Sequence, residues 1–168
     1  MNRVVIIGNS GSGKSTLAKE LGARRALPIV HLDKLFWADG SYSEKRPTDV
    51  VRAEIDRRKA ESEWIMEGVF GELAERLLDR ADYLIWLNLP WSICRSGLEM
   101  RGTSRNDDSG KVLFAALIVW AENYWTRTDL RSAVGHGQIF SGFPGEKAQI
   151  TQRDQLKPLL ENIRGKLP

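Results

Sequence analysis

The sequence has few of the residues that form disulfides and metal clusters. Cys94 is the single cysteine and only two histidines occur among 168 residues, so an intrachain disulfide and a cysteine-rich zinc site are both excluded. The absence of disulfides is typical of a reducing compartment, and we expect a cytoplasmic protein. The longest apolar run, residues 112–121, is too short to cross a bilayer, and the glycine-rich run from Gly8 leaves no room for a secretory signal. We therefore expect no membrane partner.

Strong charge asymmetry and internal repeats are also missing. Lys and Arg number 25 against 22 Asp and Glu, a formal charge of +3, and this mild excess suits anionic small molecules and nucleic acids alike. The basic residues are dispersed among acidic ones, and no helix-turn-helix, zinc-finger or RNA-binding signature occurs, which argues against nucleic acid as the main partner. The length and the 42% apolar content fit one domain over residues 1–168.

Short apolar runs alternate with longer amphipathic stretches, which is the pattern of βαβ units. Residues 3–7 form a β-branched run, typical of a strand buried on both faces, and we predict that it is the central strand of a parallel sheet. The other strands are predicted at 29–32, 64–67, 82–88 and 147–151. Helices are predicted at 13–22, 44–63, 111–127 and 155–163, with one more after Pro90 that carries Cys94 and Leu98. This order favours a three-layer α/β sandwich with a parallel five-stranded sheet, in which residues 33–63 form a small cap.

Residues 8–15 carry the strongest motif. They read Gly-Asn-Ser-Gly-Ser-Gly-Lys-Ser, the pattern of a phosphate-binding loop, and they lie between a predicted strand and a predicted helix. In such a loop the backbone N–H groups and the helix dipole bind a polyphosphate. Lys14 would reach the β- and γ-phosphates of ATP, and the Ser15 hydroxyl would ligate Mg²⁺. The predicted nucleotide ligands are Gly8, Asn9, Ser10, Gly11, Ser12, Gly13, Lys14, Ser15 and Thr16.

The motif also excludes other nucleotide proteins. Its glycines do not follow the G-x-G-x-x-G order of a dinucleotide site, so a nicotinamide cofactor is not expected. An Asn-Lys-x-Asp guanine motif is missing as well, which leaves a switch-type GTPase without support.

Polar side chains follow two further strands of the predicted sheet. His31 and Asp33 follow the second strand and Glu67 ends the third, and the carboxyl ends of parallel strands meet at the ligand-binding edge. Two carboxylates near one Mg-nucleotide suit metal coordination and activation of an acceptor hydroxyl. We predict that Asp33 positions or deprotonates the acceptor and that Glu67 acts with Ser15 on the metal. His31 either polarises an acceptor or is a hydrogen-bonded structural residue.

These motifs resemble the adenylate-kinase-like group of small P-loop kinases, most closely the bacterial proteins labelled "DNA topology modulation protein" or adenylate-kinase-related proteins. The resemblance spans most of the chain. It depends on the loop 8–15 and on the segments 31–37, 64–68 and 81–90. It implies the P-loop NTPase fold of nucleoside and small-molecule kinases. In that group the third strand usually ends Asp-Gly, whereas Glu67 stands here, and we expect the longer side chain to affect turnover more than binding.

The resemblance also implies a lid over the phosphates, at about residues 95–131. Its candidate arginines are Arg95, Arg101 and Arg105, because a guanidinium stays charged and bridges two phosphate oxygens. Arg101 is the preferred catalytic residue, whereas Arg95 and Arg105 are either phosphate ligands or solvated surface charges. Arg127 and Arg131 would share one face if the preceding helix continued through them.

Six tryptophans occur in the chain. We expect Trp86 and Trp120 to lie in the core, whereas Trp37 either stacks on an acceptor ring or packs under the cap. The resulting hypothesis is a Mg-ATP-dependent phosphotransferase that moves the γ-phosphoryl group of ATP to a nucleotide or another small hydroxyl or phosphate acceptor. The alternative is an ATP-binding regulatory or DNA-associated protein with weak ATPase activity.

Overall fold

The protein is built around a five-stranded parallel sheet, seen in a computed structural model that describes residues 2–38, 44–102 and 107–165. The strand order is β2-β3-β1-β4-β5, and every neighbouring pair is parallel. The bounds are β1 Arg3–Gly8, β2 Ile29–His31, β3 Trp64–Gly68, β4 Tyr83–Leu87 and β5 Glu146–Ile150. The predicted sheet is confirmed, with β1 at its centre.

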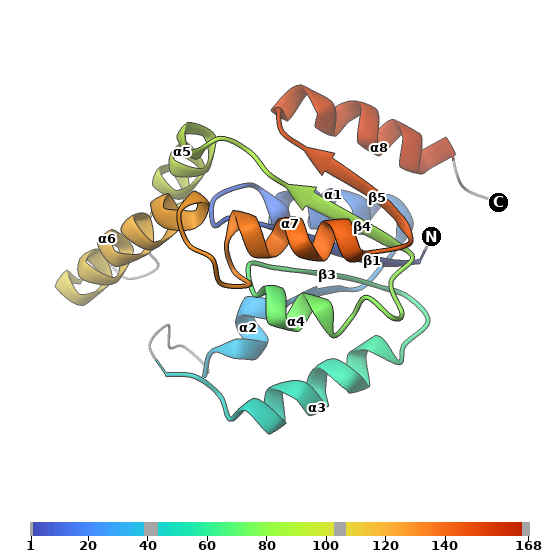
Figure 1. Cartoon of the computed structure of the whole chain (residues 1–168), viewed down its shortest axis with the longest axis horizontal. Helices are drawn as coiled ribbons and strands as arrows, with labels where there is room; N and C mark the ends of the chain where they lie inside the picture. The colour runs from blue at the N-terminus through green and yellow to red at the C-terminus, as the bar shows by residue number, and fades with distance from the viewer. Residues whose placement is uncertain (1, 39–43, 103–106, 166–168) are drawn as a thin grey trace.

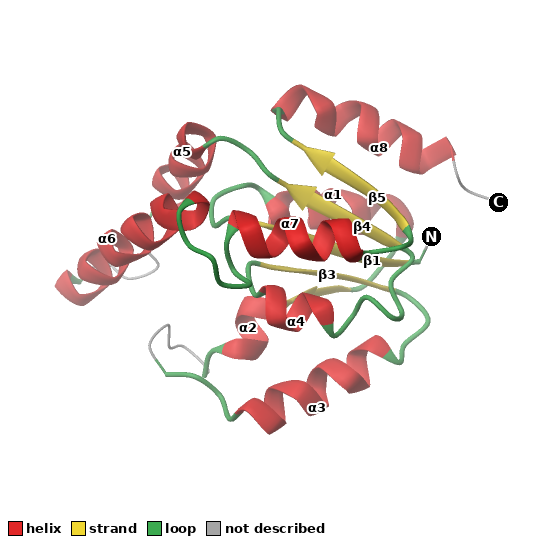
Figure 2. Cartoon of the chain, viewed as in Figure 1, coloured by secondary structure: helices red, strands yellow, loops and turns green. Residues whose placement is uncertain are grey.

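Helices cover both faces of the sheet (Figures 1 and 2). Because successive strand residues point to opposite faces, Val5 and Ile7 pack with one set of helices and Val4 and Ile6 with the other. The first set is α3 Thr48–Lys59, α4 Gly71–Glu75 and α7 Ala133–Gly142, and the second is α1 Lys14–Arg25, α5 Trp91–Arg101 and α8 Leu156–Gly165. Two apolar layers therefore hold the sheet, and its carboxyl edge is left to polar side chains.

Three α-helices of the described residues were not predicted. They are α2 Leu32–Phe36, α4 and α7. The first two have five residues each, too few to show helical periodicity. The third contains Gly135 and Gly137, which disfavour a helix, and it is started by the Ser132 hydroxyl, which accepts a hydrogen bond from the Gly135 N–H.

Two expectations about the segment after α5 were wrong. Helix α6, Asp108–Glu122, ends five residues before Arg127 and is followed by the short 3₁₀ helix η1, Asn123–Trp125, so Arg127 and Arg131 do not share a helix face. Trp120 is partly buried and packs against the core rather than lying in it, and Arg127 covers one face of its ring. Trp86 is buried, as expected.

No helix within the described ranges is long and apolar enough to span a membrane.

Candidate functional site

The phosphate loop connects the central strand β1 to α1, and the groups that it offers to a ligand are mainly backbone N–H groups. Gly13 has a φ of +94°, a left-handed conformation that glycine adopts without strain, and it directs the chain into the first turn of α1. That turn contains no acidic residue. Its free N–H groups and the positive end of the helix dipole are therefore available to an anion.

Lys14 lies folded along this loop. Its side chain is buried, and Nζ donates a hydrogen bond to the Asn9 carbonyl at 2.8 Å. The Asn9 side chain is buried as well, and its Nδ2 donates to the Ala121 carbonyl at 2.8 Å. Ser12 Oγ is buried without a hydrogen-bond partner, an arrangement that is costly unless a ligand or water completes it. The loop is thus preformed, is joined to the end of α6, and keeps an unused polar atom.

Glu67 ends β3 beside the loop and is buried. Its Oε1 accepts the Ser15 hydroxyl at 2.8 Å and lies 2.5 Å from His31 Nδ1. The extra methylene of glutamate lets the carboxylate reach Ser15 directly. Of the two interpretations of His31, the structure favours the hydrogen-bonded structural residue.

Ser15 and Glu67 are chemically suited to Mg²⁺. The ion prefers hard oxygen ligands, and it is commonly held by one or two protein oxygens together with water and phosphate. The described residues contain no group of three or more His, Cys, Asp or Glu arranged for a metal. A metal at this place would therefore share its coordination between Ser15, Glu67 and the nucleotide.

Asp33 lies on α2 at the same edge of the sheet. The Val69 backbone N–H donates to its carboxylate, while Oδ1 is buried without a partner. Burial raises the pKa of Asp33, and the charges of Lys14 and, more weakly, Arg101 oppose that rise. A carboxylate with a raised pKa and an unused oxygen is suited to accept a proton from a hydroxyl group.

The predicted lid arginines differ in their surroundings. Arg101 is exposed at the end of α5, and its charge acts on Asp33. Arg95 is exposed and forms an ion pair with Glu99 at 2.8 Å, which matches the surface interpretation. Arg105 lies outside the described residues.

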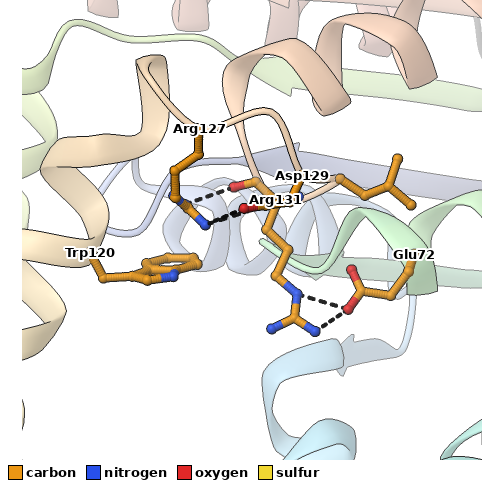
Figure 3. Close-up of a pocket in the computed structure, with 6 residues that line it drawn as sticks. Glu72, Trp120, Arg127, Asp129 and Arg131 are labelled. Carbon is orange, nitrogen blue, oxygen red and sulfur yellow. Dashed lines mark hydrogen bonds and ion pairs between the residues drawn. The ribbon is translucent and has the colours of Figure 1, made fainter.

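The structure also contains a cavity of about 440 Å³, and the described residues that line it are Glu72, Trp120, Arg127, Asp129, Leu130 and Arg131 (Figure 3). The Arg127 guanidinium stacks on the Trp120 ring at 4.0 Å and donates to Asp129 Oδ2 at 3.0 Å. Arg131 donates through Nε and Nη2 to Glu72 Oε1. The cavity is therefore lined by two arginines, each held by its own carboxylate.

Packing contacts link the residues that line the cavity to the elements that carry the predicted catalytic residues. Arg131 lies over the rings of Phe36, at 4.8 Å, and Phe70, at 4.5 Å. Phe36 is on the same short helix as Asp33, and Phe70 follows Val69. On the other side, Trp120 precedes Ala121, to which the phosphate loop is joined through Asn9. The cavity thus lies between the segment of α6 that contacts the loop and the Phe36 end of α2.

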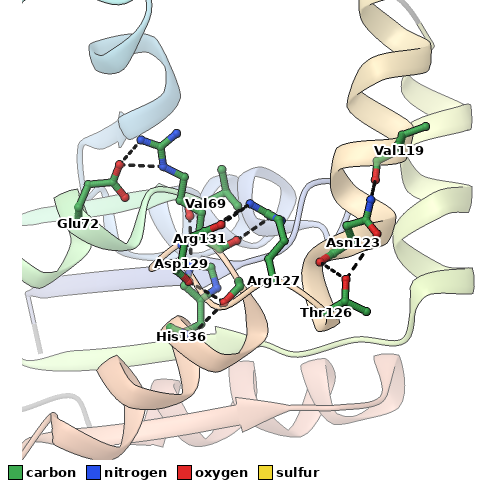
Figure 4. Close-up of polar contacts among 11 residues, drawn as sticks. Val69, Glu72, Val119, Asn123, Thr126, Arg127, Asp129, Arg131 and His136 are labelled. Carbon is green, nitrogen blue, oxygen red and sulfur yellow. Dashed lines mark hydrogen bonds and ion pairs between the residues drawn. The ribbon is translucent and has the colours of Figure 1, made fainter.

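A buried hydrogen-bond chain supports one wall of the site, and Figure 4 shows its His136 end. Trp86 Nε1 donates to Tyr124 OH at 3.0 Å, which lies 2.7 Å from His136 Nδ1. His136 Nε2 is 3.1 Å from the Val69 carbonyl. Since a carbonyl only accepts, Nε2 carries the proton and Nδ1 accepts from Tyr124. Burial lowers the pKa of His136 to about 3, so the imidazole is neutral.

Sequence reasoning missed Glu72 and Asp129. Gly71 precedes Glu72 and packs tightly against the loop that contains Asp129. A Cβ on Gly71 would lie 1.9 Å from the Leu130 carbonyl oxygen. A Cβ on Gly135 would lie 2.5 Å from the Asp129 carbonyl oxygen. These contacts hold the loop before α7 against α4, but a single sequence does not show which glycines serve close packing.

Comparisons with known proteins agree with this architecture. No protein-family model matches the chain. The cytidylate kinase of Methanosphaerula palustris is 29% identical over 106 residues, which cover 56% of this chain and 60% of that protein. The chain therefore matches less than two thirds of the length of this relative.

Two solved structures match along nearly their whole length. Shikimate kinase from Acinetobacter baumannii, in complex with shikimate, has a TM-score of 0.55 at 11% identity and covers 100% of this chain and 96% of its own. A gluconokinase from Sinorhizobium meliloti 1021 has a TM-score of 0.51 at 18% identity, with 99% and 98% coverage. The chain has the fold of small P-loop kinases. The narrower resemblance to DNA topology modulation proteins finds no support in these matches.

Proposed function

We propose that the protein is a Mg-ATP-dependent phosphotransferase that acts on a small molecule. The observation that carries the proposal is one edge of the sheet, where the phosphate loop, buried Glu67 and the partly buried Asp33 come together. The relatives named above are kinases of small molecules and nucleotides, which supports the same chemistry. We also propose that the protein acts in the cytoplasm, because ATP is supplied there.

The proposed roles follow from the contacts of each residue. Lys14 and the loop N–H groups bind the β- and γ-phosphates once Nζ leaves the Asn9 carbonyl. Ser15 and Glu67 hold Mg²⁺, which when bound neutralises charge on those phosphates. Asp33 orients the acceptor hydroxyl and accepts its proton, and Arg101 approaches the transferred group from the end of α5. Catalysis then depends on positioning and charge rather than on a covalent intermediate.

The test is Lys14→Ala with Lys19→Ala as its control, since Lys19 is exposed on the same helix. We expect Lys14→Ala to lower ATP affinity or phosphoryl transfer by at least about 100-fold, because it removes a preformed charge at the phosphates. Calorimetry with Mg-ATP and a transfer assay over a panel of acceptors measure the two effects. Unchanged binding and transfer in Lys14→Ala would refute the assignment.

The regulatory alternative predicts a different outcome of the same assay. ATP would bind tightly to the wild type, and no acceptor would receive a phosphoryl group. Salt-dependent DNA affinity would then be the measurement that supports it.

A further inference from the structure

Apart from Ser12 Oγ in the phosphate loop, three buried polar atoms of the described residues near the cavity have no hydrogen-bond partner: Glu72 Oε2 and Arg127 Nε from its lining, and Asp33 Oδ1 on α2, outside the lining. Two of them are carboxylate oxygens, which accept hydrogen bonds, and the third is a guanidinium N–H, which donates. Buried polar atoms in folded proteins are nearly always paired. A single molecule that completed all three would present two donors and one acceptor.

The charge of the cavity limits that molecule further. Among the described residues, the lining contains two guanidinium groups and two carboxylates, whose formal charges sum to zero. Arg127 is paired with Asp129 and Arg131 with Glu72. A dianionic phosphate on the acceptor would have to displace one of these carboxylates, or lie beside both of them without a countercharge.

We infer that the acceptor is a small hydroxyl-rich molecule with at most one negative charge, and not a nucleoside monophosphate. One hydroxyl donates to Asp33 Oδ1 and is the group that is phosphorylated, and a second donates to Glu72 Oε2. An oxygen of the acceptor receives the Arg127 Nε hydrogen. This inference rests on the proposed phosphotransferase function and assigns the cavity of Figure 3 as its acceptor site.

The aromatic rings near the cavity also favour a hydroxyl-rich acceptor over a nucleotide. Phe36 and Phe70 are stacked on each other at 4.1 Å, and Arg131 lies over both. Arg127 covers one face of Trp120. The rings already carry protein partners, so the cavity favours a compact aliphatic ring or chain over a stacked nucleobase.

The reaction balances without another reagent. The acceptor hydroxyl oxygen forms a bond to the γ-phosphorus of ATP, and the bond from that phosphorus to the β,γ-bridging oxygen breaks. The hydroxyl proton passes to Asp33, and ADP leaves with the electron pair of the broken bond.

The first experiment compares acceptors with the full-length wild type and Mg-ATP. D-gluconate, shikimate and D-ribose represent the hydroxyl-rich class, and CMP and AMP represent the nucleoside monophosphates. We expect at least one hydroxyl-rich probe to exceed both nucleotides in kcat/KM by about 10-fold or more. Preference for CMP or AMP would overturn the inference while leaving the phosphotransferase intact. The inference would also be overturned if none of the hydroxyl-rich probes accepts phosphate and calorimetry detects binding of none of them.

The second experiment changes the charge of the cavity. Glu72→Gln retains the shape of the side chain but frees Arg131, so kcat/KM for the hydroxyl-rich probe is expected to fall about 10- to 100-fold. CMP should improve relative to that probe, and ATP affinity should stay unchanged. Glu75→Gln, on the exposed side of the same helix, is the matched control and should change neither value.

A further variant covers the case in which Glu72→Gln does not fold. Arg127→Lys keeps the positive charge but removes the Nε donor, and it should raise KM for the hydroxyl-rich probe while ATP affinity stays constant. If both variants fold and retain the wild-type acceptor preference and KM, the cavity is not the acceptor site.

Discussion

At the scale of single residues, two carboxylates at one edge of the sheet differ in how fully their oxygens are hydrogen-bonded. Glu67 is buried but receives the Ser15 hydroxyl and contacts His31. Asp33 is partly buried and keeps one oxygen unpaired, and burial raises its pKa. An ionised carboxylate without full hydrogen bonding destabilises a fold. The presence of Asp33 at this position is therefore better explained by a role in the reaction than by a contribution to stability.

Asp33→Asn should therefore stabilise the protein and inactivate it. Because the pKa of Asp33 is raised in the folded state, the folded protein binds this proton more tightly than the unfolded chain does, and ionisation lowers stability as pH rises through the folded pKa. We expect a gain of about 1 kcal/mol in the free energy of unfolding at pH 8 and a loss of at least about 100-fold in transfer. Urea unfolding and an ATP-transfer assay measure the two effects.

The control for this prediction is Asp49→Asn, at an exposed position of α3. It should leave transfer unchanged and lower stability by about 0.5 kcal/mol, because Asp49 is an acidic residue in the first turn of α3, where its charge is favourable; the gain expected for Asp33→Asn has the opposite sign. A destabilised but active Asp33→Asn would show that this carboxylate serves the fold alone.

At the scale of elements, the phosphate loop depends on how closely α5 approaches it. A Cβ on Gly97 would lie 2.3 Å from the Gly11 carbonyl oxygen, and a Cβ on Gly11 would lie 2.0 Å from the Cys94 carbonyl oxygen. Both neighbours are backbone, which cannot move aside without shifting the loop. The helix thus sets the loop's position, and only glycine permits the contact.

Gly97→Ala should consequently weaken ATP binding from outside the motif. Overpacking of this kind costs about 1–3 kcal/mol, and the displaced Gly11 carbonyl should reorient the loop N–H groups. Gly137→Ala is the matched comparison, since its added methyl would make only an ordinary contact with Trp86 at 3.5 Å. A helical glycine replaced by alanine gains about 0.5–1 kcal/mol.

Thermal unfolding and ATP calorimetry on both variants test this pair. Equal stability and ATP affinity in the two variants would show that α5 does not position the loop.

At the scale of the whole molecule, a single buried chain of hydrogen bonds joins distant parts of the fold. Trp86 on β4, Tyr124 in η1 and His136 on α7 are linked in series to the Val69 carbonyl after β3. The chain is complete only while His136 is neutral, since protonated Nδ1 no longer accepts from Tyr124. The fold is therefore sensitive to acid at a position remote from its surface.

This sensitivity has a defined pH range. The pKa of His136 is about 3 in the folded protein, against about 6.5 in an unfolded chain. The folded state binds this proton less tightly, so stability is greatest above pH 6.5 and falls as pH decreases toward 3. Between pH 6.5 and 5 the loss should reach about 2 kcal/mol.

His136→Gln, which is unable to titrate, should be less stable at pH 7.5 but should lose less stability than the wild type between pH 6.5 and 5. Urea unfolding at several pH values measures both slopes, and carboxylates contribute mainly below that interval. Parallel curves for the two proteins would contradict the role of His136.

The fold and the phosphate loop were predictable because their signals are local. A β-branched run, a glycine-rich turn and Lys14 occupy consecutive positions, and this order alone indicates a strand, a loop and a helix start. The short helices α2 and α4 gave no such signal, and neither did α7, whose two internal glycines reflect close packing rather than helix propensity. The roles proposed for Asp33, Glu67 and Arg101 stay predictions until they are measured.

The sequence by itself determined that a loop with the phosphate-binding pattern follows the first strand of a parallel α/β sheet, since contiguous residues carry both signals. Only the tertiary structure decided how His31 meets Glu67 and which carboxylates hold Arg127 and Arg131. These partners are brought together by the sheet and by close packing on glycines, and their separation along the chain leaves no periodic or local pattern. The charge of the cavity, and with it the class of acceptor that we infer, is therefore a property of the folded molecule.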